Sequence, residues 1–515
     1  MTDHPAGMAR RTDPRTFAVK AATMLTQLVV PVAIGAVTIF DKGDFGDVAA
    51  FYLPLVLLVI AANFAVAYLR WSRLTYEVRE SDIRVESGLL SRTARAIPYE
   101  RIQDVSLEQK FLPRLFGLTE VKFETGAGGG DDLKLAYLSE DEGERLRKVV
   151  RYRRDGGVEP DGQAGAADHD EEAAEVLFAM TPGRVLKFGL FEFSLAVVAV
   201  IGGAAQQLDF LLPFDLWDLD AWQERIAGPG RWLAGLGVAA QIIGAAVALV
   251  FLAVLGLATG LVRTALREWN FRLERGEKGL RRRRGLITRT DVVMPLHRVQ
   301  ALRLGTGFVR RLFGWHSLKV VSLASDSGSA NHDAAPFAQM DEIAPIVATT
   351  GFALPDSGLP WGRRSARASF DAAMMELALF TMAAVPAYVF SPYPLIALLP
   401  LAAGLVAAIR QYYLYRVDRH ALGAQFLYSR HGWLSPKTTI GSRIRLQSVE
   451  IRQGPLARRR GYAALHLGLA GGTFEIAAMD VADARRWRAE ILESIAGTDF
   501  SRLVGPVGDP EVSGP

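Results

Sequence analysis

The sequence predicts an α-helical membrane protein that also carries α+β domains. We expect six transmembrane helices in three hairpins, each followed by a cytoplasmic antiparallel β-barrel that a C-terminal helix caps. Half of the residues are hydrophobic although 22% are charged, so the apolar residues are concentrated in segments. These segments approach the length of about 20 residues that crosses a hydrocarbon core. A pattern of arginine, glutamine and glycine also recurs three times along the chain, which predicts three related soluble domains.

The apolar segments come in pairs, and each pair is read as a helical hairpin. The last pair is separated only by the residues SPY. The six segments are residues 21–40 and 49–69, 188–207 and 233–262, and 372–390 and 394–409. The first segment lacks a small-residue cleavage site and is followed directly by a second one, so we interpret it as an anchor and not as a signal peptide.

The charges around these segments predict how the protein is oriented. Basic residues such as Arg70, Arg263 and Arg410 follow the second helix of each hairpin, whereas the tips at 41–47 and 209–224 are acidic. Because excess lysine and arginine stays on the cytoplasmic side, both termini and both long segments between hairpins are expected there. We therefore expect a multi-pass protein of the bacterial cytoplasmic (inner) membrane.

The segment RIQDVSLEQKFLPRLFG at 101–117 has two companions, at 298–314 and 445–461, that align with it without a gap. Arginine, glutamine, arginine and glycine occupy the same four positions in every copy, and a further glycine precedes each copy by thirteen residues. This agreement indicates an internal repeat. The repeated residues are Gly88, Arg101, Gln103, Arg114, Gly117, Gly285, Arg298, Gln300, Arg311, Gly314, Gly432, Arg445, Gln447, Arg458 and Gly461.

We interpret the repeated residues mainly as structural, with a ligand or partner surface as the alternative. An inward glutamine can satisfy backbone groups where a small barrel is irregular, and the final glycine permits a turn. Apolar and polar residues alternate on both sides of Ser81-Asp82, which indicates a hairpin, and Gly88 suits a turn with positive φ. Residues 92–109 are then expected to continue as one strand. The acidic start and basic end of 139–154 predict the capping helix.

The boundaries of the domains follow from these patterns. Each soluble domain comes after a hairpin, and polar segments separate one repeat from the next. The expected divisions are a basic N-terminus (1–20), hairpin 1 (21–70), domain 1 (71–154), an acidic flexible linker (155–180), hairpin 2 (181–263), domain 2 (264–352), a linker (353–370), hairpin 3 (371–411), domain 3 (412–497) and a flexible tail (498–515).

The repeat resembles the bacterial pleckstrin-homology (PH-like) membrane proteins of the YdbS/YdbT type. The likeness rests on Gly-Leu-Leu, Ile-Pro, Arg-Ile-Gln-x-Val and Arg-Leu-Phe-Gly, and it covers all three soluble units. The third copy departs from the pattern, because Ser442 stands where the others have proline and Arg459-Arg460 where they have Leu-Phe. The resemblance implies PH-like domains on membrane hairpins and a role in the cell envelope, in stress or in protection.

A run of four arginines, Arg281, Arg282, Arg283 and Arg284, lies in the early hairpin of the second domain. Each basic residue near an anionic leaflet contributes roughly 1 kcal/mol to membrane binding, so this cluster is a candidate contact for anionic lipid headgroups. A solvated face, a topology signal and a specific headgroup site are the alternatives. Nucleic acid is not an expected partner, because the aromatic residues of a stacking platform are missing.

Two glutamates, Glu192 and Glu376, lie near the start of the first helix of hairpins 2 and 3. A carboxylate within a membrane helix is a candidate functional group. Both lie close to the cytoplasmic end, where water has access, so helix pairing or an interfacial role is the favoured interpretation. Coupling to protons or ions is the alternative.

The sequence offers no arrangement of residues for catalysis. It contains no cysteine, and its eight histidines show no metal-ligand spacing. We therefore expect no catalytic, metal or cofactor residues. The function predicted is a non-enzymatic membrane protein that presents three PH-like domains for protein-partner binding, oligomerisation or membrane sensing. The alternative is a transporter or lipid-handling protein whose working part is the six-helix membrane region.

Overall fold

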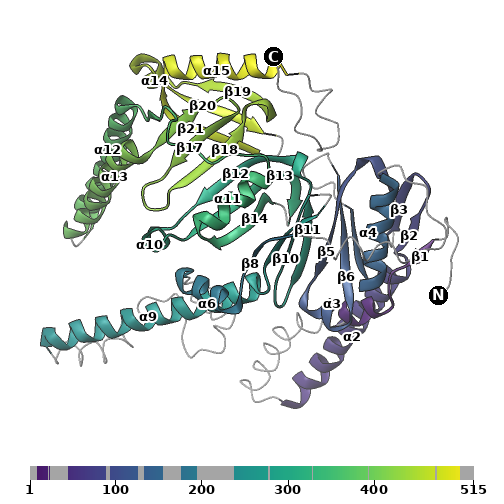
Figure 1. Cartoon of the computed structure of the whole chain (residues 1–515). Coiled ribbons are helices and arrows are strands. Elements are labelled where there is room, and N and C mark those ends of the chain that lie inside the picture. Colours follow the sequence, from purple (N-terminus) through teal and green to yellow (C-terminus); the bar gives the residue numbers. More distant parts are fainter. Residues whose placement is uncertain are drawn as a thin grey trace. The chain divides into compact units, whose positions relative to one another are not determined.

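The structure is a computed structural model of the chain. It describes residues 9–20, 22–23, 45–88, 93–125, 133–154, 175–193, 237–276, 279–326, 329–391, 394–469 and 472–498. The chain divides into two compact units, Met1–Met294 and Pro295–Pro515. Figure 1 labels the helices and strands.

Four helices in the described part of the chain are long and apolar enough to cross a membrane: α2 (Phe45–Ser72), α9 (Gly237–Glu268), α12 (Ala366–Phe390) and α13 (Leu398–Val417, preceded by the 3-10 turn η4, Pro394–Ala397). They correspond to the predicted spans at 49–69, 233–262, 372–390 and 394–409. Most of the two remaining predicted spans, 21–40 and 188–207, lies outside the described residues, as do most of the linker at 155–180 and of the tail at 498–515. A shorter helix, α6 (Pro182–Phe191), overlaps the beginning of the second of these spans.

Seven described strands come from each repeat: one before its hairpin and six after it. In repeat 1 they are β1 (Arg10–Arg11), β2 (Thr75–Val78), β3 (Asp82–Ser87), β4 (Thr93–Pro98), β5 (Ile102–Gln109), β6 (Leu118–Thr125) and β7 (Leu133–Ser139). In repeat 2 they are β8 (Glu175–Ala179), β9 (Arg272–Gly276), β10 (Gly279–Arg284), β11 (Arg289–Met294), β12 (Val299–Gly305), β13 (His316–Asp326) and β14 (Ser329–Ala338). In repeat 3 they are β15 (Gly362–Arg363), β16 (Arg419–Leu422), β17 (Phe426–His431), β18 (Lys437–Ser442), β19 (Leu446–Arg452), β20 (Tyr462–Leu469) and β21 (Gly472–Asp480).

The expectation of one continuous strand over residues 92–109 is wrong. A 3-10 turn interrupts it in every repeat: η1 (Tyr99–Arg101), η3 (Leu296–Arg298) and η5 (Arg443–Arg445). In the first two repeats Pro98 and Pro295 precede the turn. Proline fixes φ and has no N–H to donate to a ladder, so it favours a break there. The first repeated arginine ends this turn, and the strand after it enters a different sheet.

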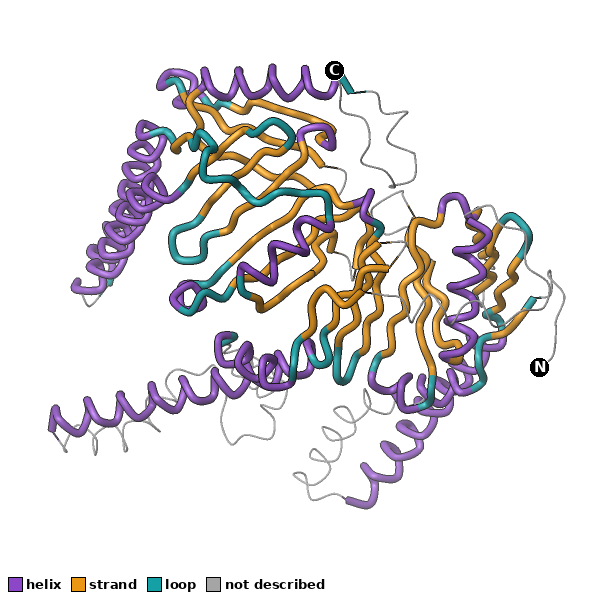
Figure 2. The backbone as a smooth tube through the Cα atoms, viewed as in Figure 1, coloured by secondary structure: helices purple, strands orange, loops and turns teal. Residues whose placement is uncertain are grey.

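The sheets are shared between neighbouring repeats, which the sequence did not predict. A four-stranded sheet has the order β1-β2-β3-β4, and a three-stranded sheet has the order β19-β20-β21. The two seven-stranded sheets have the orders β7-β6-β5-β11-β10-β9-β8 and β14-β13-β12-β18-β17-β16-β15. In each of these, the last three strands of one repeat continue directly into the first four of the next (Figure 2). Three separate sheet systems, one for each repeat, are therefore not observed.

Each repeat ends in a helix, as predicted: α4 (Glu140–Arg154), α11 (Met340–Thr349) and α15 (Val481–Ala496). In repeat 1, Leu146 and Val150 of α4 share one hydrophobic core with Ile83 of the four-stranded sheet and Phe123 of β6. In repeat 3, Trp487 of α15 occupies the corresponding place in a second core. These cores are apolar on the inner face of each strand, as the alternating pattern requires.

Candidate interaction surfaces at the repeat joints

The joints between repeats are the ladders β5–β11 and β12–β18. In the first, Glu108 lies opposite Thr290. In the second, Gly305 lies opposite Lys437. When the copies are aligned on Arg101, Arg298 and Arg445, these two pairs occupy equivalent positions. Both joints therefore have the same antiparallel register.

The repeated glutamines mark a backbone irregularity in the strand that follows each 3-10 turn. A register shift occurs between Ile102 and Asp104, and equivalent shifts occur at Gln300 and Gln447. Gln300 is buried, and its Nε2 donates to the carbonyl of Arg298 at 3.2 Å. A β-bulge leaves one residue out of the ladder and re-aims the strand. The predicted use of glutamine at an irregular part of the sheet is thus seen at Gln300.

The repeated glycines have the backbone conformation that the sequence predicts for Gly88. The glycines that open the joint strands have φ values of 121° at Gly88, 114° at Gly285 and 101° at Gly432. The glycines that close the pattern also have positive φ. They follow the short helices α3 (Phe111–Leu115), α10 (Phe308–Leu312) and α14 (Pro455–Arg460), which the sequence did not predict.

Two repeated arginines connect one repeat to the next. Arg114 of repeat 1 donates to the carbonyl of Leu286 in repeat 2. Arg445 of repeat 3 donates to the carbonyl of Val299 in repeat 2 and lies over the ring of Phe352 at 5.7 Å. Burial lowers the pKa of the Arg445 guanidinium. These side chains support the interpretation that the repeated residues are structural, and the structure they stabilise is the joint.

The β5–β11 joint contains a buried ionic cluster. Asp291 of β11 receives a two-point contact from Arg281, with the shortest distance 2.6 Å, and a contact from Arg147 of α4 at 3.2 Å. Burial raises the pKa of Asp291, but hydrogen bonds from Arg281 and the charges of Arg147, Arg281 and Arg283 outweigh it, so the pKa lies below its ordinary value. A hollow of about 440 Å³ adjoins this cluster. The charged side chains that line this hollow pair with one another, so we interpret the cluster as an ion network that stabilises the structure.

The four consecutive arginines do not form a continuous basic surface. The Arg282 side chain is fully buried, and Arg284 pairs with the buried carboxylate of Glu268 at 3.0 Å. Arg281 is held by Asp291, and Arg283 lies opposite Asp291 in the β10–β11 ladder with a 38% exposed side chain. Contact of this cluster with anionic lipid stays a prediction, and Arg283 is its most exposed member.

Glu376 is paired across hairpin 3. Its Oε1 accepts from Arg410 of α13 at 2.7 Å and from Gln411 at 2.7 Å. Gln411 in turn accepts from Arg364 at 3.2 Å. The carboxylate of Glu376 thus lies between two donors of the neighbouring helix. This geometry agrees with the helix-pairing interpretation of Glu376.

The same network continues into the third soluble domain through Asp418. Arg364 lies 3.4 Å from its Oδ2, and His431 Nδ1 lies 2.8 Å from the same atom. The backbone N–H of Gly432 donates to Oδ1 at 3.0 Å. Hairpin 3 is thus connected by polar contacts to the turn at the repeated glycine.

Glu192 ends helix α6, and its backbone lies against α9. A Cβ on Gly260 would come within 1.7 Å of the Glu192 carbonyl oxygen, and one on Gly189 within 2.7 Å of the Leu261 backbone. Glycines at such a contact allow two membrane helices to approach closely. This contact involves the backbone of Glu192, and the helix-pairing or interfacial role of its carboxylate stays a prediction.

The short helices α3 and α10 expose apolar side chains. Leu115 is 72% exposed, and on α10 Leu312 is 68% and Phe313 61% exposed. The equivalent helix α14 carries arginines instead, and Arg460 pairs with Asp371 of α12 at 2.7 Å. In the first repeat, Arg15 reaches the carbonyl of Phe116 directly after α3. The helices α3 and α14 therefore lie where their own hairpins enter the soluble domain.

Sequence reasoning missed the acidic residues Asp291, Asp371 and Asp418. None of them recurs in the other repeats, so the repeat pattern could not reveal them. A signal existed for Asp291 alone: in a hairpin that turns at Gly285, it falls opposite Arg283. Among the described residues, no group of three histidine, aspartate or glutamate side chains is arranged to hold a metal ion.

The model of the Bacterial PH domain family matches residues 30–154, 232–349 and 377–495. The chain belongs to this family. Each match includes the second helix of a hairpin together with the soluble domain that follows. The UPF0699 transmembrane protein YdbT of Bacillus subtilis (strain 168) is 26% identical over 269 residues, which are 50% of this chain and 51% of that protein. The chain thus spans about half the length of this relative. No solved structure gives a significant match.

The family matches and the apolar helices show that the chain is a membrane protein with three bacterial PH domains. The resemblance inferred from the repeated residues is confirmed. The precise number of membrane helices, the orientation of the termini and the choice of the inner membrane stay predictions.

Proposed function

We propose that this chain is a non-enzymatic membrane scaffold whose neighbouring PH repeats are joined by shared sheets and present binding surfaces at the cytoplasmic face. The observation that carries the proposal is the equal register of the β5–β11 and β12–β18 joints. Because their sheets are continuous, neighbouring repeats are held together in one defined arrangement. Domains that bind their partners independently would need only a flexible linker between them. A role in envelope stress or protection rests on the family resemblance.

The second part of the proposal is contact between α10 and the bilayer surface. Leu312 and Phe313 are exposed next to Arg311, and an amphipathic segment of this kind places its apolar side chains at the boundary between headgroups and acyl chains. The related helix α14 contacts the beginning of α12, which supports a membrane-proximal position for this element. Anionic headgroups are the expected lipid partner, through Arg311 and Arg283.

The membrane contact is tested with the full chain in liposomes. Because the protein has no cysteine, Leu312→Cys accepts a single environment-sensitive fluorophore. We expect its emission to shift to the blue and to be quenched by lipid-borne quenchers, more strongly with anionic lipid. The matched control is Lys319→Cys on β13, whose side chain is 47% exposed and which should stay in water. Equal exposure of both probes to water would contradict the contact.

The same liposomes separate the scaffold from the transporter alternative. A scaffold leaves lipid scrambling and ion flux at the level of empty liposomes. The transporter alternative predicts activity that depends on Glu376, the carboxylate paired with Arg410. Transport by the intact chain that Glu376→Gln abolishes would overturn the proposed function.

A further inference from the structure

The two joints follow one rule. In each repeat one strand precedes the 3-10 turn (β4, β11, β18) and one follows it (β5, β12, β19). The strand that follows the turn pairs with the strand that precedes the turn of the next repeat. Among the described residues, repeat 1 comes first and repeat 3 comes last in this series of joined repeats. Their outer strands, β4 and β19, are therefore the two strands at which the rule would add a further joint.

Both end strands have one edge that takes part in no ladder of the described chain. In that part of the protein, β4 pairs with β3 alone and β19 with β20 alone. Their burial differs from that of the equivalent strands inside the series. Four residues of β12 are buried but only one of β19, and three residues of β11 and of β18 are buried but only one of β4. An exposed edge is a template for a further strand.

The register of the internal joints can be applied to these edges. Gly305 opposite Lys437 corresponds to Arg452 opposite Thr93 in the first and last repeats. The next positions bring Glu450 opposite Arg95 and Val449 opposite Ala96. Opposite charges that face each other across a ladder stabilise it, whereas like charges destabilise it. This register, which the chain already uses, thus places one pair of opposite charges face to face; Glu450 also pairs with Arg452 of its own strand at 2.9 Å.

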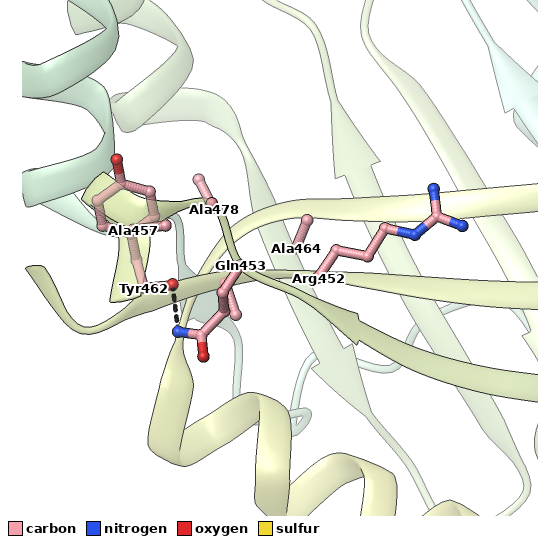
Figure 3. Close-up of a pocket in the computed structure, with 8 residues that line it drawn as sticks. Arg452, Gln453, Ala457, Tyr462, Ala464 and Ala478 are labelled. Atoms are coloured by element: carbon pink, nitrogen blue, oxygen red, sulfur yellow. Dashed lines mark hydrogen bonds between the residues drawn. The ribbon is translucent and has the colours of Figure 1, made fainter. Parts of the chain in front are cut away.

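The surface beyond the end of β19 is equivalent to a place in the β12–β18 joint that the backbone of the next repeat occupies. A hollow of about 540 Å³ lies there, and Gln453 and Tyr462 are among the residues that line it (Figure 3). Gln453 Nε2 donates to the Tyr462 carbonyl at 2.8 Å. The residue equivalent to Gln453 in repeat 2 is Thr306. Its Oγ1 donates to Trp315 in the same way, and its backbone N–H donates to Pro436 of the next repeat at 3.2 Å. The backbone of a following repeat would enter the hollow at this point.

The arginine that anchors an internal joint also recurs at the end of the series. Arg445 donates to the carbonyl of Val299 in the preceding repeat. Its equivalent in repeat 1 is Arg101, an exposed residue that follows β4. In a joint with a preceding repeat 3, the equivalent acceptor would be the carbonyl of Leu446.

We propose that the chain associates head to tail with further copies of itself, β19 of one chain pairing antiparallel with β4 of the next. This inference rests on the proposed scaffold function and names its partner as a second copy of the chain. The contact joins two different surfaces, so repetition closes into a ring or grows as a filament in the plane of the membrane. Main-chain hydrogen bonds supply the ladder, and Arg95 with Glu450 specifies its register.

Cysteine cross-linking of the full chain in membranes tests the pairing. Residues directly opposite in an antiparallel pair have Cα atoms about 4.5–5.5 Å apart, within the range that a disulfide bridges. Chains with Arg95→Cys and chains with Glu450→Cys, carrying different tags, are co-expressed and oxidised. We expect a cross-linked product that contains both tags and no product from either variant alone. The out-of-register pair, Thr93→Cys with Ser448→Cys, should give none.

Two further variants make the result decisive. Arg303→Cys with Thr439→Cys, opposite each other in the β12–β18 joint of one chain, reports that oxidation succeeds and that the fold is intact. If this pair closes but Arg95→Cys with Glu450→Cys does not, the proposal is overturned. A dimer from Glu450→Cys alone would show a two-fold contact and overturn it as well. Arg95→Glu should weaken association, because it places like charges opposite each other, and Glu450→Arg in the same chain should restore it.

The outcome is independent of the test of the proposed function. Loss of the head-to-tail cross-link together with a lipid-quenched Leu312 probe would leave a membrane scaffold that does not assemble with itself. Transport that depends on Glu376 would overturn the scaffold function even if the cross-link forms.

Discussion

The β5–β11 and β12–β18 joints have the same register but different side chains. The first joint pairs three residues of each strand and places Asp291 opposite Leu107, within a cluster of arginines. The second pairs five residues of each strand and includes the buried pair Leu302 and Ile440. Both joints share the backbone turn and the bulge, so their common register does not require that they have the same side chains. The side chains decide how each joint is stabilised: by ion pairs in the first and by apolar packing in the second.

Removal of the ionic centre should have the largest effect. Asp291→Ala removes the carboxylate that holds the buried Arg281 and one of the two carboxylates that pair with Arg147, which keeps Glu144. Breaking such a buried network typically costs about 3–5 kcal/mol of unfolding free energy. Urea titration of the full chain in detergent micelles measures the loss. The control is Asp483→Ala, an exposed partner of Arg486, which should change stability by less than about 1 kcal/mol. An equal effect of both variants would show that the first joint does not depend on its ions.

Removal of the apolar centre tests the second joint. Leu302→Ala opens a cavity opposite Ile440, where both side chains are fully buried, and should cost about 2–5 kcal/mol. The same titration measures it, and the exposed Leu312→Ala provides the matched control. If Leu302→Ala and Leu312→Ala were equally stable, apolar packing would not be the interaction that stabilises this joint.

The turns that lead into the joints can be compared by one substitution each. A Cβ on Gly285 would lie 1.8 Å from the Thr288 carbonyl oxygen, whereas a Cβ on Gly432 would lie 2.9 Å from that of Ser435. Both glycines have positive φ, so each alanine adds backbone strain of roughly 1–3 kcal/mol. We expect Gly285→Ala to lower the melting temperature more than Gly432→Ala. A larger loss of melting temperature for Gly432→Ala would show that these Cβ distances do not decide the cost of the substitution.

The smallest expected effect is a loss of stability at acidic pH that Asp291 contributes in the first joint and that has no counterpart at the equivalent position of the second. The pKa of Asp291 is lowered in the folded protein, so its contribution to stability is present above the unfolded pKa of about 3.9 and is lost as the pH falls through the folded value. Melting temperatures measured from neutral pH down to about pH 3 should fall less steeply for Asp291→Asn than for the native chain. Parallel curves would mean that Asp291 ionises alike in both states.

The sequence alone was sufficient for the local elements. Runs of apolar residues located α2, α9, α12 and α13, and their length is enforced by the thickness of the bilayer. Alternation and the Ser81-Asp82 break located the β2–β3 hairpin, and the repeated glycines located turns that need positive φ. These signals are local because each depends on the period or conformation of a single segment. The sequence prediction did not include the break at the 3-10 turn, although Pro98 and Pro295 indicate it.

The candidate site was only partly predictable. The sequence leads to the interpretation that the repeated arginines and glutamines are structural, but it does not predict that Arg114, Gln300 and Arg445 lie at joints between repeats. The run from Arg281 to Arg284 was expected to face lipid, whereas its ion partners Asp291 and Glu268 become visible once the strands and helix are packed. A carboxylate that pairs with a distant basic residue carries no sequence pattern unless the two lie on one hairpin, as Arg283 and Asp291 do.

By itself, the sequence determined a membrane protein with three homologous soluble repeats, because apolar length, alternation and repetition are properties of the chain read in order. Only the tertiary structure decided that β5 continues into β11 and β12 into β18. The physical reason is that strands pair through backbone N–H and C=O groups, which every residue except proline carries alike. Which edge meets which is settled by turns, bulges and packing acting together.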